Sequence, residues 1–454
     1  MKAFILLLAV LMQSCIGYSQ LYQGTWQGDL NIGATTLPFV LHLKYIDGQW
    51  NVTADSPNQG VKGIVGQATT KEDSLFVSLQ GGIQIRGLLF GKDTIKADFN
   101  QNGLKLPLTL QRQGDVEEAS KPLLRPQTPK PPYSYDTLDV KFQNNYDNIP
   151  LMGTLTFPKG GGQYPAVVLV TGSGPQNRNE ELFGHQPFKV LADYLTRHGI
   201  VVLRYDDRGV GQSGGVFETS TIENFSKDAI AAFEFLKQQK QVDPQKVGII
   251  GHSEGGLIAQ LLAGQHVLDL SFIVSLAGPS ISIDKLMVQQ LYAIGKAEGM
   301  TELSLEIAKR INVKNFEVIK GGLDTKEAYD ALLRNVGITS SNAQNTEIRT
   351  ELLTMLAPAY RYFLRIEPEE YISQIKIPVF AAFGSLDVQV PANSNLKSLF
   401  DLLPKHPKTV LKEYEGLNHL FQPAKTGKVA EYMQIEETID PQVLQDLTVW
   451  IKGL

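Results

Sequence analysis

The sequence predicts a small antiparallel all-β domain followed by a doubly wound α/β domain with a mostly parallel sheet and a helical insert. Two patterns support this prediction. Residues 20–112 contain short runs that alternate apolar and polar residues, whereas the later apolar runs are nearly continuous and are separated by helical segments. The composition is that of a globular protein, because 43% of the 454 residues are apolar and 20% are charged.

Residues 1–19 have the order of a secretory signal peptide. A positive charge precedes an apolar stretch over residues 3–12, and small residues follow, so we expect cleavage after Ser19 and export to the periplasm or outside the cell. The apolar stretch is too short to span a bilayer, so we expect no integral membrane segment in the mature chain. A lipoprotein anchored through Cys15 stays open as the alternative.

Residues 20–112 are expected to form about eight strands, closed into a small barrel or sandwich. Residues 37–43, 75–79 and 83–88 alternate in this way, and turn signals separate them. The opening residues 24–28 resemble the first strand of lipocalin-like barrels. Residues 113–132 are rich in proline and charge, a composition typical of an extended linker.

Residues 133–454 are expected to form the α/β domain. Its helices are expected at about 185–197, 221–240, 253–264, 393–402 and 440–452, between apolar strand runs. The connection from Leu276 to Pro378 is far longer than one crossover helix needs, so we expect a helical lid at about 280–373. Thr301 and Asp324 are start signals for helices in this lid, and Gly337 is a stop signal.

The sequence Gly251-His252-Ser253-Glu254-Gly255 follows a buried-strand run and precedes a helix. Strand, sharp turn and helix around G-x-S-x-G are typical of a nucleophile elbow, in which the serine is exposed at the top of a sheet. We therefore expect Ser253 to be the nucleophile. We expect the side chain of His252 to point away from the site.

A serine nucleophile needs a base that a carboxylate orients. His419 and Asp387 each follow a strand-like run, which places them at the carboxyl edge of the sheet, and they are the expected base and acid. The expected oxyanion hole consists of the backbone N–H groups of Glu254 and Ser173, the latter in the glycine-rich loop 171–175.

Four motifs in this order resemble the bacterial α/β-hydrolase group described as serine aminopeptidase-like or dipeptidyl-aminopeptidase-like hydrolases. They are residues 172–178, 204–213, 251–256 and 384–391. The resemblance covers about residues 135–454, implies an α/β-hydrolase fold, and implies Ser253, Asp387 and His419 as the triad. Thr171 departs from the histidine that many α/β hydrolases have there. Residues 360–364 are similar to an aromatic stretch of such members. Tyr360, Tyr362 and Phe363 are candidates to contact substrate as walls of the acyl pocket, and packing of the lid onto the sheet is the alternative role for these side chains.

The expected function is hydrolysis of carboxylic esters through an acyl-serine intermediate, without cofactor or metal. An exported aminopeptidase or dipeptidyl-peptidase-like enzyme acting on short peptides is the alternative. It would need carboxylates to hold a free amine, and the lid offers Glu298, Glu302, Glu306, Glu367, Glu369 and Glu370. A ligand-binding role of the β domain is a third possibility. The net charge of −5 gives no reason to expect nucleic acid, and we expect the Asp206-Asp207 turn to be structural.

Overall fold

The computed structural model describes residues 22–337 and 352–454, apart from 33–34, 47–48, 60, 72–73, 102–103 and 114–123. The expected signal peptide and Cys15 lie outside the described residues. The described chain divides into two compact units, one before residue 114 and one from Leu124 onward, which are described separately. The second unit thus begins inside the segment expected to be a linker.

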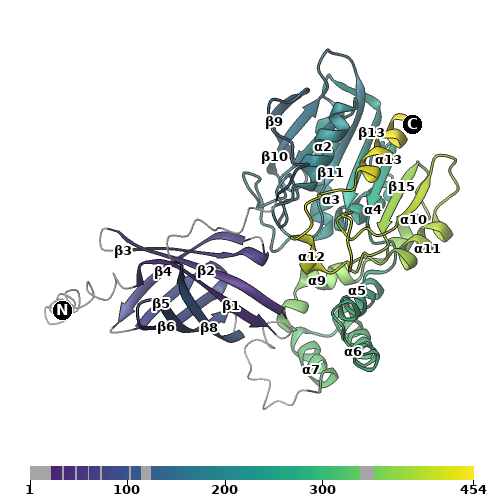
Figure 1. The fold of residues 1–454 in the computed structure, drawn as a ribbon. Helices are drawn as coiled ribbons and strands as arrows, with labels where there is room; N and C mark the ends of the chain where they lie inside the picture. Colours follow the sequence, from purple (N-terminus) through teal and green to yellow (C-terminus); the bar gives the residue numbers. More distant parts are fainter. Residues whose placement is uncertain are drawn as a thin grey trace. The chain divides into compact units, whose positions relative to one another are not determined.

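The first unit is a closed barrel of eight antiparallel strands in sequential order (Figure 1). The strands are β1 (Gly24–Ile32), β2 (Thr35–Ile46), β3 (Gln49–Ser56), β4 (Val61–Lys71), β5 (Ser74–Leu79), β6 (Ile83–Phe90), β7 (Thr94–Gln101) and β8 (Leu104–Gln113). Pairing of β1 with β8 closes the barrel. Alternate residues point inward, so side chains such as Trp26, Leu41 and Phe99 fill the interior. The expected all-β domain is confirmed as a barrel with a packed core.

The second unit has an eight-stranded sheet in the order β16-β15-β14-β13-β11-β12-β10-β9. The strands are β9 (Asp136–Asn144), β10 (Ile149–Phe157), β11 (Tyr164–Val170), β12 (Val201–Tyr205), β13 (Val242–His252), β14 (Phe272–Leu276), β15 (Val379–Gly384) and β16 (Val410–Tyr414). The strands β11 to β16 pair in parallel, and β10 joins them antiparallel through β12. The central strands are buried throughout, which explains their continuous apolar runs. The expected α/β fold is confirmed.

Helices cover this sheet at or near the expected positions. They are α2 (Pro187–Arg197), α3 (Ile222–Lys237), α4 (Glu254–Gln265), α11 (Ala392–Leu402) and α13 (Pro441–Lys452). The short helix α12 (Val429–Tyr432) was not expected. Among the described residues, no helix is both long and apolar enough to cross a membrane.

The long connection between β14 and β15 is helical, as expected. Its described helices are α5 (Ile283–Ala297), α6 (Glu302–Lys320), α7 (Thr325–Asn335), α9 (Pro358–Leu364) and α10 (Pro368–Ile372). The side chains of Thr301 and Asp324 accept the backbone N–H groups of Ser304 and Glu327, so both expected start signals cap helices. The lid therefore begins after the carboxyl end of β14, and after α10 the chain returns to the amino end of β15, which runs parallel to β14.

Candidate active site

Ser253 lies in a sharp turn between β13 and α4, with a φ of 53° and a ψ of −118°. An added Cβ at Gly251 would lie 1.9 Å from the oxygen of Gly255, and one at Gly255 would lie 2.0 Å from the oxygen of Val170. Only glycine allows this approach of helix and strand, which is why the serine stands between two glycines. The N–H of Ser253 donates to Leu276 on the neighbouring strand at 2.8 Å. The turn thus holds Ser253 at the carboxyl end of β13.

Asp387 and His419 follow β15 and β16 and meet directly. Oδ2 of Asp387 lies 2.7 Å from Nδ1 of His419, and their side chains are 0% and 5% exposed. Oδ1 of Asp387 accepts the backbone N–H groups of Gln389 and Val390, each at 2.8 Å. The carboxylate is therefore fixed, and it orients the ring of His419 so that Nε2 is left for another partner.

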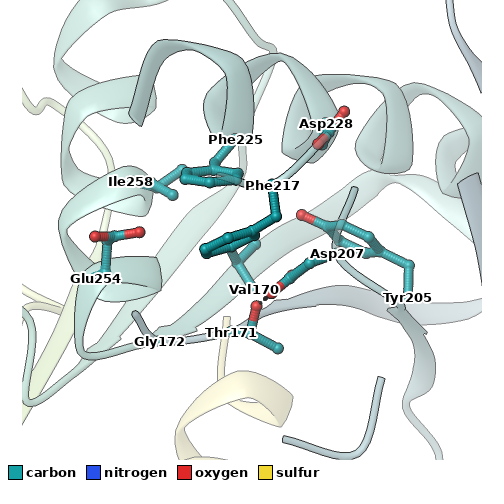
Figure 2. A pocket seen from close by; sticks show the side chains of 10 residues that line it. All are labelled: Val170, Thr171, Gly172, Tyr205, Asp207, Phe217, Phe225, Asp228, Glu254 and Ile258. Atoms are coloured by element: carbon teal, nitrogen blue, oxygen red, sulfur yellow. Dashed lines mark hydrogen bonds between the residues drawn. The ribbon is translucent and has the colours of Figure 1, made fainter. Parts of the chain in front are cut away.

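The loop after β11 carries Ser173 and is held from the turn after β12. Thr171 Oγ1 donates to Asp207 Oδ1 at 2.6 Å (Figure 2). The Gln176 N–H donates to Asp207 Oδ2 at 2.9 Å. Arg178 pairs with Asp206 at 2.6 Å. The Asp206-Asp207 turn is thus structural, as expected, and Thr171 supports the loop despite its departure from the family pattern. Burial raises the pKa of Asp207 to about 7, although the hydrogen bonds from Thr171 and Gln176 lower it.

Glu254 follows Ser253 and begins α4. Within the described residues, neither its backbone N–H nor that of Ser173 donates a hydrogen bond, so both remain open for a ligand oxygen. The carboxylate of Glu254 accepts the hydroxyl of Ser173 at 3.3 Å. Burial raises the pKa of Glu254 to about 7, and the Ser173 hydroxyl opposes this shift. Glu254 lines a small pocket together with Phe217, Phe225 and Ile258 (Figure 2).

A cavity of about 710 Å³ brings these residues together. Ser173, Ser253, Glu254 and His419 all line it, and most of the remaining wall is apolar. The described lining contains no lysine or arginine. A cavity of this volume accommodates a drug-sized organic molecule.

The lid forms one wall of this cavity. Tyr360 and Phe363 of α9 line it, together with Leu286 and Met287 of α5. Residues of the lid therefore share this cavity with Ser253. Tyr362 lies elsewhere, because it is 40% exposed and is absent from the lining.

His252 was expected to point away from the site, and this expectation is wrong. Its ring lies 4.8 Å from the ring of His419, centroid to centroid, and it lines the cavity. Its nitrogens contact Glu180 and the backbone oxygen of His419. Glu180, which the sequence analysis missed, is 72 residues away and lies in an irregular loop with a φ of 52°. No local sequence pattern could have linked the two.

The described residues contain no group of histidine, cysteine, aspartate and glutamate that could hold a metal ion. The lid glutamates considered for amine binding do not line the cavity. Three of them contact the side chains of Lys428, Tyr292 and Lys309 instead: they are Glu298, Glu302 and Glu306. The carboxylates that do line the cavity belong to Glu180, Glu218 and Glu254.

Comparison with known proteins gives similar proteins named as an esterase and as acyl transferases. The chain is 27% identical to "Esterase EstD" of Thermotoga maritima over 78% of this chain and 77% of that protein. It is 24% identical to an "Acyl transferase" of Photorhabdus luminescens over 42% of this chain and 58% of that protein.

Solved structures of α/β hydrolases also resemble the chain. "Alpha/beta hydrolase GrgF" from Penicillium has a TM-score of 0.44 and 17% identity over 70% of this chain and 98% of that one. The esterase Pf2001 of Pyrococcus furiosus has a TM-score of 0.43 and 16% identity over 73% of this chain and 98% of that one. The profile of the family described as serine aminopeptidase, S33, matches residues 185–422, more than half of the chain. The chain therefore belongs to the serine aminopeptidase S33 family and is a serine hydrolase.

Proposed function

We propose that this protein hydrolyses carboxylic esters through an acyl-serine intermediate on Ser253. One arrangement carries the proposal: Ser253 and His419 line the same cavity, and the Asp387 carboxylate lies 2.7 Å from the Nδ1 of His419. Acyl transfer through a serine requires a histidine that takes the hydroxyl proton and a carboxylate that orients this histidine.

In the acylation step, the hydroxyl oxygen of Ser253 attacks the ester carbonyl while Nε2 of His419 takes the proton. Asp387 holds the Nδ1–H tautomer and stabilises the imidazolium ion that forms. His419 then gives the proton to the departing alcohol. In the second half, His419 takes a proton from water while the water oxygen attacks the acyl-serine. His419 then returns this proton to the Ser253 oxygen as the acid is released.

The negative charge of the tetrahedral intermediate needs donors that are already in place. We assign this role to the backbone N–H groups of Ser173 and Glu254. Both residues line the cavity, and neither N–H donates elsewhere among the described residues. Loop 171–176 is held by Asp207, so its donors need no rearrangement during the reaction.

The substrate is proposed to be an ester with an uncharged, largely apolar acyl group. The described cavity wall is mostly apolar and has no cationic side chain to pair with a carboxylate substrate. Tyr360 and Phe363 are placed to contact the acyl group. The Thermotoga maritima relative is named an esterase, which agrees with this substrate class.

Labelling with a fluorophosphonate tests the nucleophile, and a panel of p-nitrophenyl esters beside aminoacyl and dipeptidyl nitroanilides tests the substrate class. We expect the label on Ser253 and faster turnover of the esters. A label on a different serine would overturn the mechanism.

A peptidase acting on short peptides is the second candidate. Glu218 and Glu254 line the cavity and supply the carboxylate that a free amine would need. Turnover of aminoacyl nitroanilides that Glu218→Gln abolishes, with ester turnover unchanged, would favour this candidate.

We also propose that the protein is exported, on the basis of residues 1–19 alone. Cell fractionation with N-terminal sequencing tests this proposal. A mature chain that begins at Gln20 supports cleavage after Ser19, whereas a lipid-modified Cys15 supports the anchored alternative.

A further inference from the structure

Both ring nitrogens of His252 face hydrogen-bond acceptors. Nδ1 lies 2.9 Å from Oε1 of Glu180, and Nε2 lies 2.9 Å from the backbone oxygen of His419. A carbonyl oxygen cannot donate, so Nε2 must carry a proton. The same Oε1 of Glu180 accepts the N–H of Gly172 at 2.8 Å. An ionised Glu180 carboxylate accepts at this oxygen from both groups, and the His252 ring then carries a second proton on Nδ1.

The surroundings of the ring favour this doubly protonated form. The side chains of His252 and Glu180 are only 8% and 6% exposed. Burial opposes a charged ring, but the charge and hydrogen bond of Glu180, the His419 carbonyl and the charge of Asp387 outweigh it and raise the pKa of His252. The residues lining the small cavity beside the pair are otherwise apolar and include Phe188, Leu191, Leu276 and Leu420.

The pair connects the segments that carry the proposed chemistry. Glu180 holds the N–H of Gly172, the residue before Ser173, and His252 holds the carbonyl of His419. His252 itself precedes Ser253. A shift of either partner would move an oxyanion donor and the base relative to the nucleophile.

We propose that His252 is a constitutively charged imidazolium ion which, paired with the Glu180 carboxylate, positions the Ser173 loop and His419 for the reaction at Ser253. Both are positioning residues, because they act through the backbone of Gly172 and His419. The reaction that they position is the proposed ester hydrolysis, but the charge of His252 is independent of it.

The charge is measured directly by NMR of the full chain carrying ring-¹⁵N-labelled histidine. We expect the His252 signal, identified by its loss in His252→Gln, to be that of an imidazolium ion from pH 6 to pH 8. His185 is the internal reference, because burial and the nearby Arg125 lower its pKa to about 4 and it must be neutral there. A neutral His252 at pH 6 to 7 would overturn the proposal, whatever the enzyme assays show.

Glu180→Gln tests the positioning role. Glutamine keeps an oxygen for the Gly172 N–H but removes the charge, so His252 should lose its proton at lower pH. We expect the kcat of the variant to approach that of the wild type at pH 6 and to fall at least about tenfold below it at pH 8, with KM within about threefold. A titration common to both proteins, such as that of Glu254, cancels in this ratio.

Glu181→Gln is the matched control, because Glu181 is the neighbouring and exposed glutamate. The ratio of the kcat of Glu181→Gln to that of the wild type should stay near one at every pH. A Glu180→Gln ratio that is equally constant with pH would contradict the proposed role. If Glu180→Gln does not fold, the NMR titration of the wild type alone decides. Failure of Ser253 to label would refute the proposed function but leave the charge of His252 intact.

Discussion

The described part of the chain contains two histidine–aspartate pairs of similar length, and one of them lies in the candidate active site. In the α/β unit, His419 and Asp387 are 2.7 Å apart and almost fully buried. In the barrel, His42 and Asp55 are 3.0 Å apart with side chains 32% and 23% exposed. The barrel pair even has a hydroxyl beside it, because Thr25 Oγ1 lies 3.1 Å from the second ring nitrogen of His42.

The difference lies in the backbone that carries the hydroxyl. Thr25 belongs to the regular strand β1, which pairs with β2 on one side and with β8 on the other. The backbone N–H and C=O groups around Thr25 are therefore used in the hydrogen bonds of the sheet. Ser253 stands in a turn with a φ of 53°, beside N–H groups that remain open and a cavity that admits a ligand. A serine hydrolase site therefore needs a strained turn and free donors as much as it needs the three side chains.

The largest expected effect is a difference in kcat between variants of the two histidine–aspartate pairs. Asp387→Asn presents an amide to Nδ1 of His419 and favours the wrong ring tautomer, so kcat on p-nitrophenyl butyrate should fall on the order of 10³- to 10⁴-fold. Asp55→Asn should leave kcat unchanged. Steady-state assays of both variants check this, and a comparable loss in the barrel variant would show that the pairs are not functionally distinct.

The second prediction compares what the barrel and the segment that follows it contribute to the stability of the α/β unit. Arg125 donates to the backbone oxygens of Phe183, Met433 and Ile435 at 2.7–3.0 Å. A chain that starts at Leu124 should fold and keep its kcat within about tenfold, since no proposed catalytic group precedes Ser173. A chain that starts at Pro132 loses these charged hydrogen bonds, and its Tm should be lower by on the order of 5 °C.

Thermal unfolding of the two truncated chains, read by circular dichroism, makes this comparison. Equal Tm values would show that the contacts of Arg125 contribute little. Insolubility of both chains would show that the α/β unit does not fold without the barrel.

The sequence was informative where local pattern and chain order decide the structure. Period-two alternation predicted the barrel strands, and continuous apolar runs predicted the parallel strands that end at Ser253, Asp387 and His419. The Glu180–His252 pair was missed because it joins an irregular loop to a strand end, and only the folded sheet brings them together. The aromatic stretch 360–364 was noticed, but its helical phase sends Tyr362 outward while Tyr360 and Phe363 reach the cavity.

That difference within the lid gives the third prediction. Phe363→Ala enlarges the cavity, so kcat/KM for long acyl chains relative to short ones should change by about tenfold, the value of one or two methylenes in an apolar pocket. Tyr362→Ala is the control and should leave the chain-length preference unchanged. A lower Tm for Phe363→Ala without a change in preference would assign Phe363 to packing of the lid.

The smallest expected effect concerns Glu254, whose backbone N–H is the proposed oxyanion donor and whose side chain belongs to the same residue. Burial raises the pKa of Glu254 to about 7, so the carboxyl is neutral at pH 6 and becomes charged as the pH rises through that value. A negative charge beside a developing oxyanion opposes it, and a repulsion of ~1 kcal/mol corresponds to about a fivefold loss of rate.

Glu254→Gln keeps the backbone N–H and removes the charge. The ratio of kcat/KM in Glu254→Gln to that in the wild type should therefore be near one at pH 6 and rise to about five at pH 8.5. Glu415→Gln, which changes an exposed carboxylate after β16, should give a ratio of one throughout. A Glu254→Gln ratio that does not rise with pH would mean that the carboxylate forms without disturbing the oxyanion, and the neighbouring N–H would then be the wrong donor.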